Sequence, residues 1–305
     1  MEGQDQERAR GLAYMIAVYV AWGLLPAYWK LLQGIAPLTI LAHRALWAFV
    51  LLAIVLLAVY KPKHILLPLK NRKTLVLYLL ASVSLVVQWV AYLLAIVTDH
   101  LLDLSMGYYL YPIVVVVLGM VFLKERMTSY QLMALALALL GVLIKILQYK
   151  SIPTLALVLA FSFSIYSIIK KKIRINSVNS IFYEILFMVP FSLAYILAGE
   201  LGGSGYFIEL HPGSAMLLIG GGLATAATLL LFASGARRIP IFTVGFLQYI
   251  SPTMVLLLGV FVYGEDFNRG QLIVFAFIWL GLAVCSIPGI IALMKRFLRR
   301  RGAGT

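Results

Sequence analysis

Long apolar runs, separated by short stretches that contain charged residues, proline or glycine, dominate the chain. A transmembrane helix needs about 20 mostly apolar residues, and ten runs approach or reach that length. The predicted spans are residues 12–32, 37–60, 74–97, 104–123, 128–148, 153–169, 179–199, 214–235, 241–263 and 271–294. The pattern predicts an all-α polytopic membrane protein with ten transmembrane helices.

Composition supports this class of protein and excludes others. The chain is 63% hydrophobic and 12% charged, whereas soluble domains are about 45–50% apolar and about 25% charged. The formal net charge of +14 would suggest nucleic-acid binding in a soluble protein, but no soluble domain is predicted that could carry a basic face. We therefore expect no nucleic-acid partner. The single cysteine, Cys285, excludes an intrachain disulfide framework.

Basic residues are distributed unevenly between the two sides of the predicted spans. With the N-terminus in the cytoplasm, 20 of the 25 Lys and Arg residues fall in cytoplasmic segments, four fall outside, and Arg44 lies within the second span. Because basic loops mark the cytoplasmic side, we expect a multi-pass protein of the cell (plasma or inner) membrane. Both the leader, residues 1–11, and the basic tail, residues 295–305, are expected in the cytoplasm, where basic segments contact anionic lipid.

The chain contains an internal repeat with an offset of 140 residues. The shift aligns seven informative identities without a gap: Lys30 with Lys170, Tyr109 with Tyr249, Pro112 with Pro252, Gly119 with Gly259, Glu125 with Glu265, Gln131 with Gln271, and Gly141 with Gly281. Each unit holds five predicted spans, and an odd number forces the second unit to enter the membrane in the opposite direction. We expect two inverted five-helix repeats, residues 12–151 and 152–294.

Inverted repeats are a recurrent transporter architecture in which one half rocks against the other around a site near the bilayer midplane. The architecture favours a secondary transporter that works by alternating access. A channel or a structural membrane protein could also be built in this way. An integral membrane enzyme is less favoured, since the four histidines and one cysteine are scattered along the chain.

Several short motifs extend over nearly the whole chain, from about Gly11 to Ile291. They are Trp22-Gly23, Pro26-Ala27-Tyr28, His43-Arg44, Ser105-Met106-Gly107-Tyr108-Tyr109, Tyr166, Glu184 with Pro190, Gly245-Phe246-Leu247-Gln248-Tyr249-Ile250-Ser251-Pro252-Thr253, and Phe277-Ile278-Trp279. Together they resemble the RarD-type branch of the EamA, drug/metabolite transporter superfamily. The resemblance implies a ten-helix carrier in which spans one to four and six to nine surround a central cavity and spans five and ten are peripheral. It also implies export or permeation of a small metabolite or drug-like molecule.

Two ionisable residues inside predicted spans are the main site candidates, because such groups usually face a bundle interior or a wet cavity. Arg44 and Glu184 are separated by 140 residues and are therefore repeat mates. Arg44 is expected to bind an anionic or polar substrate group or to serve as a structural anchor. Glu184 is expected to form an ion pair with Lys170 or Arg174, or to bind a proton or a cationic substrate group. A fixed structural ion pair is the alternative for Glu184.

Other polar and aromatic residues are candidates for the cavity wall. Gln88 and Tyr92 share one face of a helix because they are four residues apart, while Tyr109, Gln248 and Tyr249 occupy equivalent positions before the two repeated prolines. Trp22 is expected to contribute an aromatic wall from a bent first helix. Interhelical hydrogen bonds are the alternative role for the amides and phenols.

Repeated helix breakers are candidates for gating. Pro112 and Pro252 each remove one helix hydrogen bond, and Gly119 and Gly259 follow seven residues later; fixed bends are the alternative. The triplet Gly220-Gly221-Gly222 is interpreted as a point of close helix packing. Glu125 and Glu265 are interpreted as interfacial charges near Arg126 and Arg269. No metal or cofactor is expected, proton coupling is a candidate driving force, and no feature specifies an oligomeric state.

Overall fold

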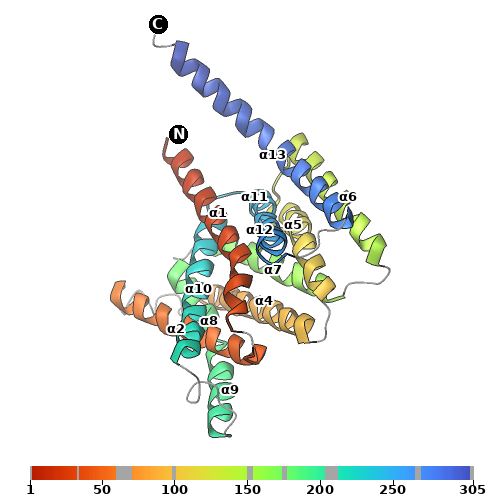
Figure 1. Ribbon diagram of the computed structural model, residues 1–305. Coiled ribbons are helices and arrows are strands. Elements are labelled where there is room, and N and C mark those ends of the chain that lie inside the picture. Colours follow the sequence, from red (N-terminus) through yellow and green to blue (C-terminus); the bar gives the residue numbers. More distant parts are fainter. Residues whose placement is uncertain are drawn as a thin grey trace.

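The computed structural model describes residues 2–32, 34–59, 71–97, 101–149, 154–173, 177–202, 212–264 and 269–302, and within these ranges it is helical, with no strands (Figure 1). The helices are α1 (Glu2–Lys30), α2 (Pro37–Val59), α4 (Arg72–Val97), α5 (Leu101–Leu123), α6 (Ser129–Tyr149), α7 (Thr154–Lys172), α8 (Ser177–Leu186), α9 (Val189–Leu201), α10 (Pro212–Ala236), α11 (Ile241–Leu247), α12 (Ile250–Leu257), the π-helical turn η2 (Leu258–Val262) and α13 (Arg269–Gly302).

Each of the ten ranges predicted as spans contains a helix or a pair of helices joined at a break. Six of the described helices are long and apolar enough to cross a membrane, or seven if the bent pair α8 and α9 is one span. Three shorter apolar helices lie at Gly107–Leu123, Ser129–Ile144 and Leu272–Pro288. The chain is therefore an all-α polytopic membrane protein.

The terminal helices extend further than predicted. α1 begins at Glu2 instead of residue 12, so the described part of the leader is helical, and α13 continues through most of the basic tail to Gly302. Within the leader, the Glu7 carboxylate accepts hydrogen bonds from Arg10 one turn away, at 3.0 Å, and from Arg238, at 2.8 Å. Apolar run length marks the membrane-embedded part of a helix but does not mark its ends, because polar turns can continue it.

Two of the helical segments in the second half are broken, whereas their repeat counterparts are continuous. α8 and α9 bend by 48° at residues 187 and 188, but α2 is unbroken. α11 and α12 are separated at Gln248 and Tyr249, where the amide nitrogens of Gln248, Tyr249 and Ser251 each donate to a carbonyl three residues back. Pro252 follows this break and Gly259 lies in η2, while Pro112 and Gly119 lie within the unbroken α5.

The 140-residue shift turns one packing contact between the halves into another. A Cβ added to Gly141 in α6 would lie 3.3 Å from the Val274 carbonyl of α13, and one added to Gly281 in α13 would lie 3.0 Å from the Ala134 carbonyl of α6. The two contacts are repeat equivalents of each other. α6 and α13 therefore pack closely along one edge of the molecule, and α13 continues beyond the bundle (Figure 1).

The core between α1, α5, α7 and α10 is a cluster of aromatic rings. Trp22 stacks on Phe232 with ring centroids 5.5 Å apart and meets Phe163 edge-on at 5.4 Å. Tyr166 also stacks on Phe232, at 5.8 Å. Each such pair contributes about 0.5–1.5 kcal/mol beyond its buried area. The cluster joins helices of both halves and holds Trp22 in place, within an α1 that runs unbroken past Pro26.

Candidate functional site

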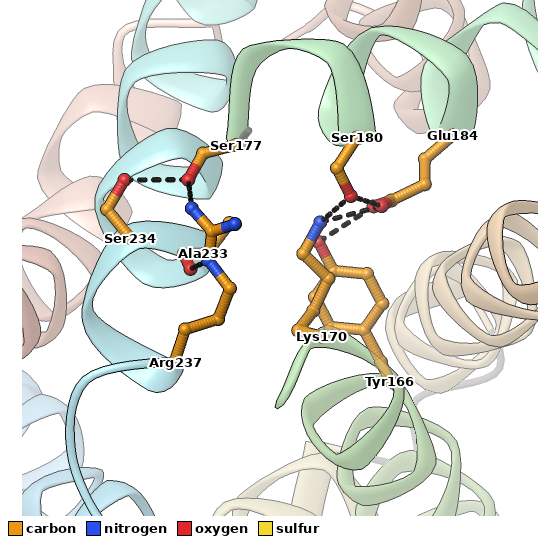
Figure 2. Close-up of polar contacts among 8 residues, drawn as sticks. All are labelled: Tyr166, Lys170, Ser177, Ser180, Glu184, Ala233, Ser234 and Arg237. Atoms are coloured by element: carbon orange, nitrogen blue, oxygen red, sulfur yellow. Dashed lines mark hydrogen bonds and ion pairs between the residues drawn. The ribbon is translucent and has the colours of Figure 1, made fainter. Parts of the chain in front are cut away.

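A buried ion pair connects α7 to α8. Lys170 Nζ lies 2.6 Å from Glu184 Oε1, and the exposed fractions of the two side chains are 1% and 0%. Ser180 Oγ accepts from Lys170 and donates to the same carboxylate oxygen, each at 2.6 Å, while Tyr166 Oη donates to Glu184 Oε2 at 3.1 Å (Figure 2). Both carboxylate oxygens are therefore hydrogen-bonded, which allows the charges to be buried.

The sequence of α8 explains how these groups meet. Ser177, Ser180 and Glu184 are spaced three and four residues apart, which places them on one face of the helix. At the start of this face, Ser177 Oγ accepts from Arg237 and lies 3.0 Å from Ser234 Oγ of α10 (Figure 2). The polar face of α8 thus leads from Arg237 to the buried ion pair. Tyr78 of α4 interacts electrostatically with both Glu184 and Arg237.

Arg237 also lines a pocket of about 380 Å³ at this end of the molecule. The other lining residues are Glu125, Arg126, Lys171, Arg238, Ile239 and Pro240. Partial burial lowers the pKa of Arg237 from its ordinary value, and the neighbouring Arg238 cation lowers it further. The pocket lies beside the basic segments that the sequence predicts to be cytoplasmic.

Glu125 connects the two halves at the same pocket. Its carboxylate accepts from the backbone amide of Ile241 at 2.9 Å, and Lys171 Nζ lies 2.6 Å from Glu125 Oε1. Lys171 also donates to the Ile239 carbonyl at 2.8 Å. Glu125 thus satisfies a free amide at the start of α11. The interpretation of Glu125 as an interfacial charge near Arg126 missed this link, because the partners lie 46 and 116 residues away; Glu265 lies outside the described residues.

Arg44 has a different environment from its repeat mate Glu184. Its Nε donates to Thr225 Oγ1 of α10 at 2.7 Å, and its guanidinium carbon lies 4.3 Å from the centre of the Trp89 ring and 5.6 Å from that of Trp29. Tyr92 interacts with it electrostatically. The structure therefore gathers two of the predicted cavity residues, Arg44 and Tyr92, into one group, and it adds Thr225, which sequence reasoning did not identify.

The remaining predicted residues lie elsewhere. Tyr249 Oη donates to the carbonyl of its own repeat mate, Tyr109, at 3.2 Å, and both residues are buried. Gln248 is 3% exposed and its Oε1 has no hydrogen-bond partner among the described residues. Gln88 is half-buried on α4, and Trp22 lies in the aromatic cluster. The predicted set is thus divided between several regions.

Helix breakers and glycines occupy the contact between α5 and α11. A Cβ added to Gly245 would lie 3.0 Å from the Pro112 carbonyl, and one added to Gly119 would collide with the Ile241 side chain. Within the described residues, no group of three or more His, Cys, Asp or Glu side chains is placed to hold a metal ion. The described polar side chains can bind a ligand through hydrogen bonds and charge pairs inside an apolar helix bundle.

One family model matches nearly the whole chain. The EamA-like transporter family model matches twice, over residues 9–147 and 150–287. The chain is 41% identical over 291 residues to "Uncharacterized transporter YojE" of Bacillus subtilis (strain 168), covering 94% of this chain and 97% of that protein. It is 32% identical over 285 residues to "Protein RarD" of Escherichia coli (strain K12), covering 93% and 96%. A protein of known crystal structure, 16% identical, shares the fold with a TM-score of 0.69 over 91% of this chain and 97% of that chain.

Proposed function

Because the chain belongs to the EamA-like transporter family, we propose that it is a secondary transporter that moves a small metabolite or drug-like molecule across the cell membrane by alternating access. Export or permeation is the proposed activity. The family and the names of the relatives already indicate a membrane transporter.

The proposed architecture is ten transmembrane helices in two inverted repeats, residues 12–151 and 152–294, with both termini in the cytoplasm. The two matches of one family model, one in each half, support it. The exchange of the Gly141–Val274 contact for the Gly281–Ala134 contact also supports it. A bundle of this kind can open alternately to each side when one half rocks against the other.

The observation that carries the proposal is the buried ion pair between Lys170 of α7 and Glu184 of α8, because α8 ends two residues after Glu184 at the bend to α9. A fully buried pair is a weak source of stability, and ionisable groups inside membrane helices are most often functional. We assign Glu184 as a gating or proton-binding residue that exchanges partners during the cycle. The polar face of α8 connects it with the pocket beside Arg237.

The proposed substrate cavity uses the residues singled out by the sequence. Arg44, Gln88, Tyr92, Trp22 and Tyr109 of the first half and Gln248 and Tyr249 of the second are proposed to line it when the halves move, since the structure divides them between several regions. Gln248 is well suited to bind a polar substrate group because its buried carbonyl oxygen has no partner among the described residues. Pro252 and Gly259, at the breaks around α12, are the proposed moving elements, and Pro112 and Gly119 are their continuous counterparts.

Counterflow in proteoliposomes tests the transport proposal. A ligand screen by thermal shift on the purified protein supplies test compounds, and each hit is loaded inside vesicles and exchanged for labelled external compound. Saturable counterflow is expected for wild type and for Arg72→Gln, a control at an exposed residue. It is expected to be lost in Glu184→Gln at equal protein abundance. Flux without saturation or counterflow would identify a channel, and wild-type exchange by Glu184→Gln would remove Glu184 from the mechanism.

A further inference from the structure

Among the described residues, one hydrogen bond holds the Arg44 guanidinium and uses one of its five N–H donors. Thr225 Oγ1 donates its proton to the Gly221 carbonyl at 2.8 Å, so its oxygen accepts from Arg44 Nε at 2.7 Å. This contact fixes the plane of the guanidinium. The two terminal nitrogens, which carry four N–H donors, have no hydrogen-bond acceptor among the described residues.

Glycines of α10 make this arrangement feasible. A Cβ added to Gly221 would lie 3.0 Å from the Trp29 ring, and one added to Gly222 would lie 2.7 Å from the Ala48 backbone nitrogen. α10 can therefore approach α1 and α2 closely enough for Thr225 to reach Arg44. The glycine triplet positions the arginine as well as packing the helices.

The guanidinium is surrounded by aromatic rings instead of carboxylates. Its carbon lies 4.3 Å from the Trp89 ring centre and 5.6 Å from that of Trp29, and no described Asp or Glu lies within ion-pair distance of it. Cation–π contacts stabilise the cation by about 0.5–2 kcal/mol each without neutralising it. An arginine inside a membrane helix that lacks an acidic partner is costly, and an anion would remove that cost.

The internal repeat shows which charge is missing. In the second half, Lys170 and Glu184 neutralise each other at 2.6 Å. Their repeat mates are Lys30 and Arg44, so the first half has a second cation where the other half has an acid. Lys30 Nζ lies 3.3 Å from the centre of the Tyr263 ring, again without a carboxylate among the described residues. The first half thus contains two cations that no described acid neutralises.

We infer that Arg44 is the recognition site for the carboxylate of a small organic anion, and that this anion belongs to the substrate class of the transporter. The inference rests on the proposed transport function. The substrate carboxylate takes the two terminal guanidinium nitrogens in a bidentate contact, the geometry for which arginine is suited. Thr225 acts as a positioning residue, and the indole rings exclude water from the pair.

A matched-pair binding experiment tests the inference. Purified full-length protein is screened by thermal shift against small carboxylates and their primary amides, for example benzoate with benzamide and hexanoate with hexanamide, and dissociation constants of hits are measured by calorimetry. Carboxylates are expected to stabilise the protein and amides are not. Because hydrogen bonds to charged groups are strong, Arg44→Gln is expected to weaken carboxylate binding about tenfold or more, and Thr225→Val to weaken it by a smaller factor of about three to ten.

The control is Arg72→Gln, which removes the same charge from an exposed position at the start of α4 and is expected to bind as wild type does. Three outcomes would overturn the inference. They are equal stabilisation by amides and carboxylates, carboxylate binding that is unchanged in both Arg44→Gln and Thr225→Val, and no response to any carboxylate. If Arg44→Gln does not fold, Thr225→Val decides alone. Counterflow separates the two proposals. If amides or amines are exchanged and carboxylates are not, the transport proposal stands and the proposal of an anionic substrate is wrong. If compounds bind in an Arg44-dependent way but none is exchanged, the transport proposal is wrong.

Discussion

Neutralising one member of the Lys170–Glu184 pair should cost far more than neutralising both. In Glu184→Gln, the amide oxygen can still accept from Lys170 and Ser180 and the amide nitrogen can donate to Tyr166, so the hydrogen bonds survive while the charge is lost. In Lys170→Met, a carboxylate remains buried with only the Ser180 and Tyr166 hydroxyls as donors. Each single variant therefore leaves one uncompensated charge at a position that is at most 1% exposed.

The expected magnitudes follow from that burial. Removing one partner of a buried pair costs about 3–5 kcal/mol, whereas replacing both by neutral groups is often nearly neutral. At about 2–4 °C per kcal/mol for a chain of this order of size, each single variant should lower the melting temperature by roughly 6–20 °C. The double variant Lys170→Met/Glu184→Gln should be nearly as stable as wild type, so it should recover most of the roughly 3–5 kcal/mol that either single variant loses.

Melting temperatures of the four proteins of this cycle, measured in detergent at one pH, provide the assay. Lys172→Met is the matched control: it removes the same charge from the exposed neighbour on α7 and should change stability by less than about 0.5 kcal/mol. Additive losses in the double variant, or a Glu184→Gln protein as stable as wild type, would refute the reasoning. Counterflow then separates the two roles of the pair. If the pair is purely structural, the double variant should transport normally. If Glu184 gates or binds a proton, the double variant should fold but should not transport.

Two further predictions concern contacts between helices. Gly222→Ala should destabilise the protein by about 1–3 kcal/mol through overpacking, because the new Cβ would collide with Trp47. Gly213→Ala on the same helix is the control and should not destabilise it, because nothing lies within 4 Å of the new Cβ. Equal melting temperatures of the two variants would contradict this packing. Glu125→Gln should lower the melting temperature by a few degrees at low salt. The loss should be smaller at high salt, because the ion pair with Lys171 is partly exposed and is therefore screened. A loss that does not depend on salt would show that the ion pair contributes nothing to stability.

Much of the fold was predictable from the sequence. The ten predicted ranges all contain helices, because run length and bounding residues are local properties of the chain. The glycine triplet was correctly interpreted as close packing, since Gly221 and Gly222 face α1 and α2 with no room for a side chain. α1 and α13 extend beyond the predicted spans, because polar residues continue a helix that the apolar pattern does not mark.

The site was less predictable. Repeat symmetry gave a reason to place Lys170 beside Glu184, and the structure has them in contact. The same symmetry suggested no difference in helix continuity between the halves, yet the break before Pro252 has no counterpart at Pro112. A proline removes one hydrogen bond in either case, and the packing around it decides whether the helix continues.

The class of protein, the positions of the apolar helices and the repeat follow from the sequence, because hydrophobic length, charge and self-similarity are properties of a linear chain. Which charges have partners depends on how the helices pack against one another. Glu184 meets a lysine 14 residues away, Glu125 meets one 46 residues away, and Arg44 meets a threonine 181 residues away and two indole rings. Those differences arise from which helices are neighbours in space, and they make the two repeat mates, Arg44 and Glu184, chemically unlike.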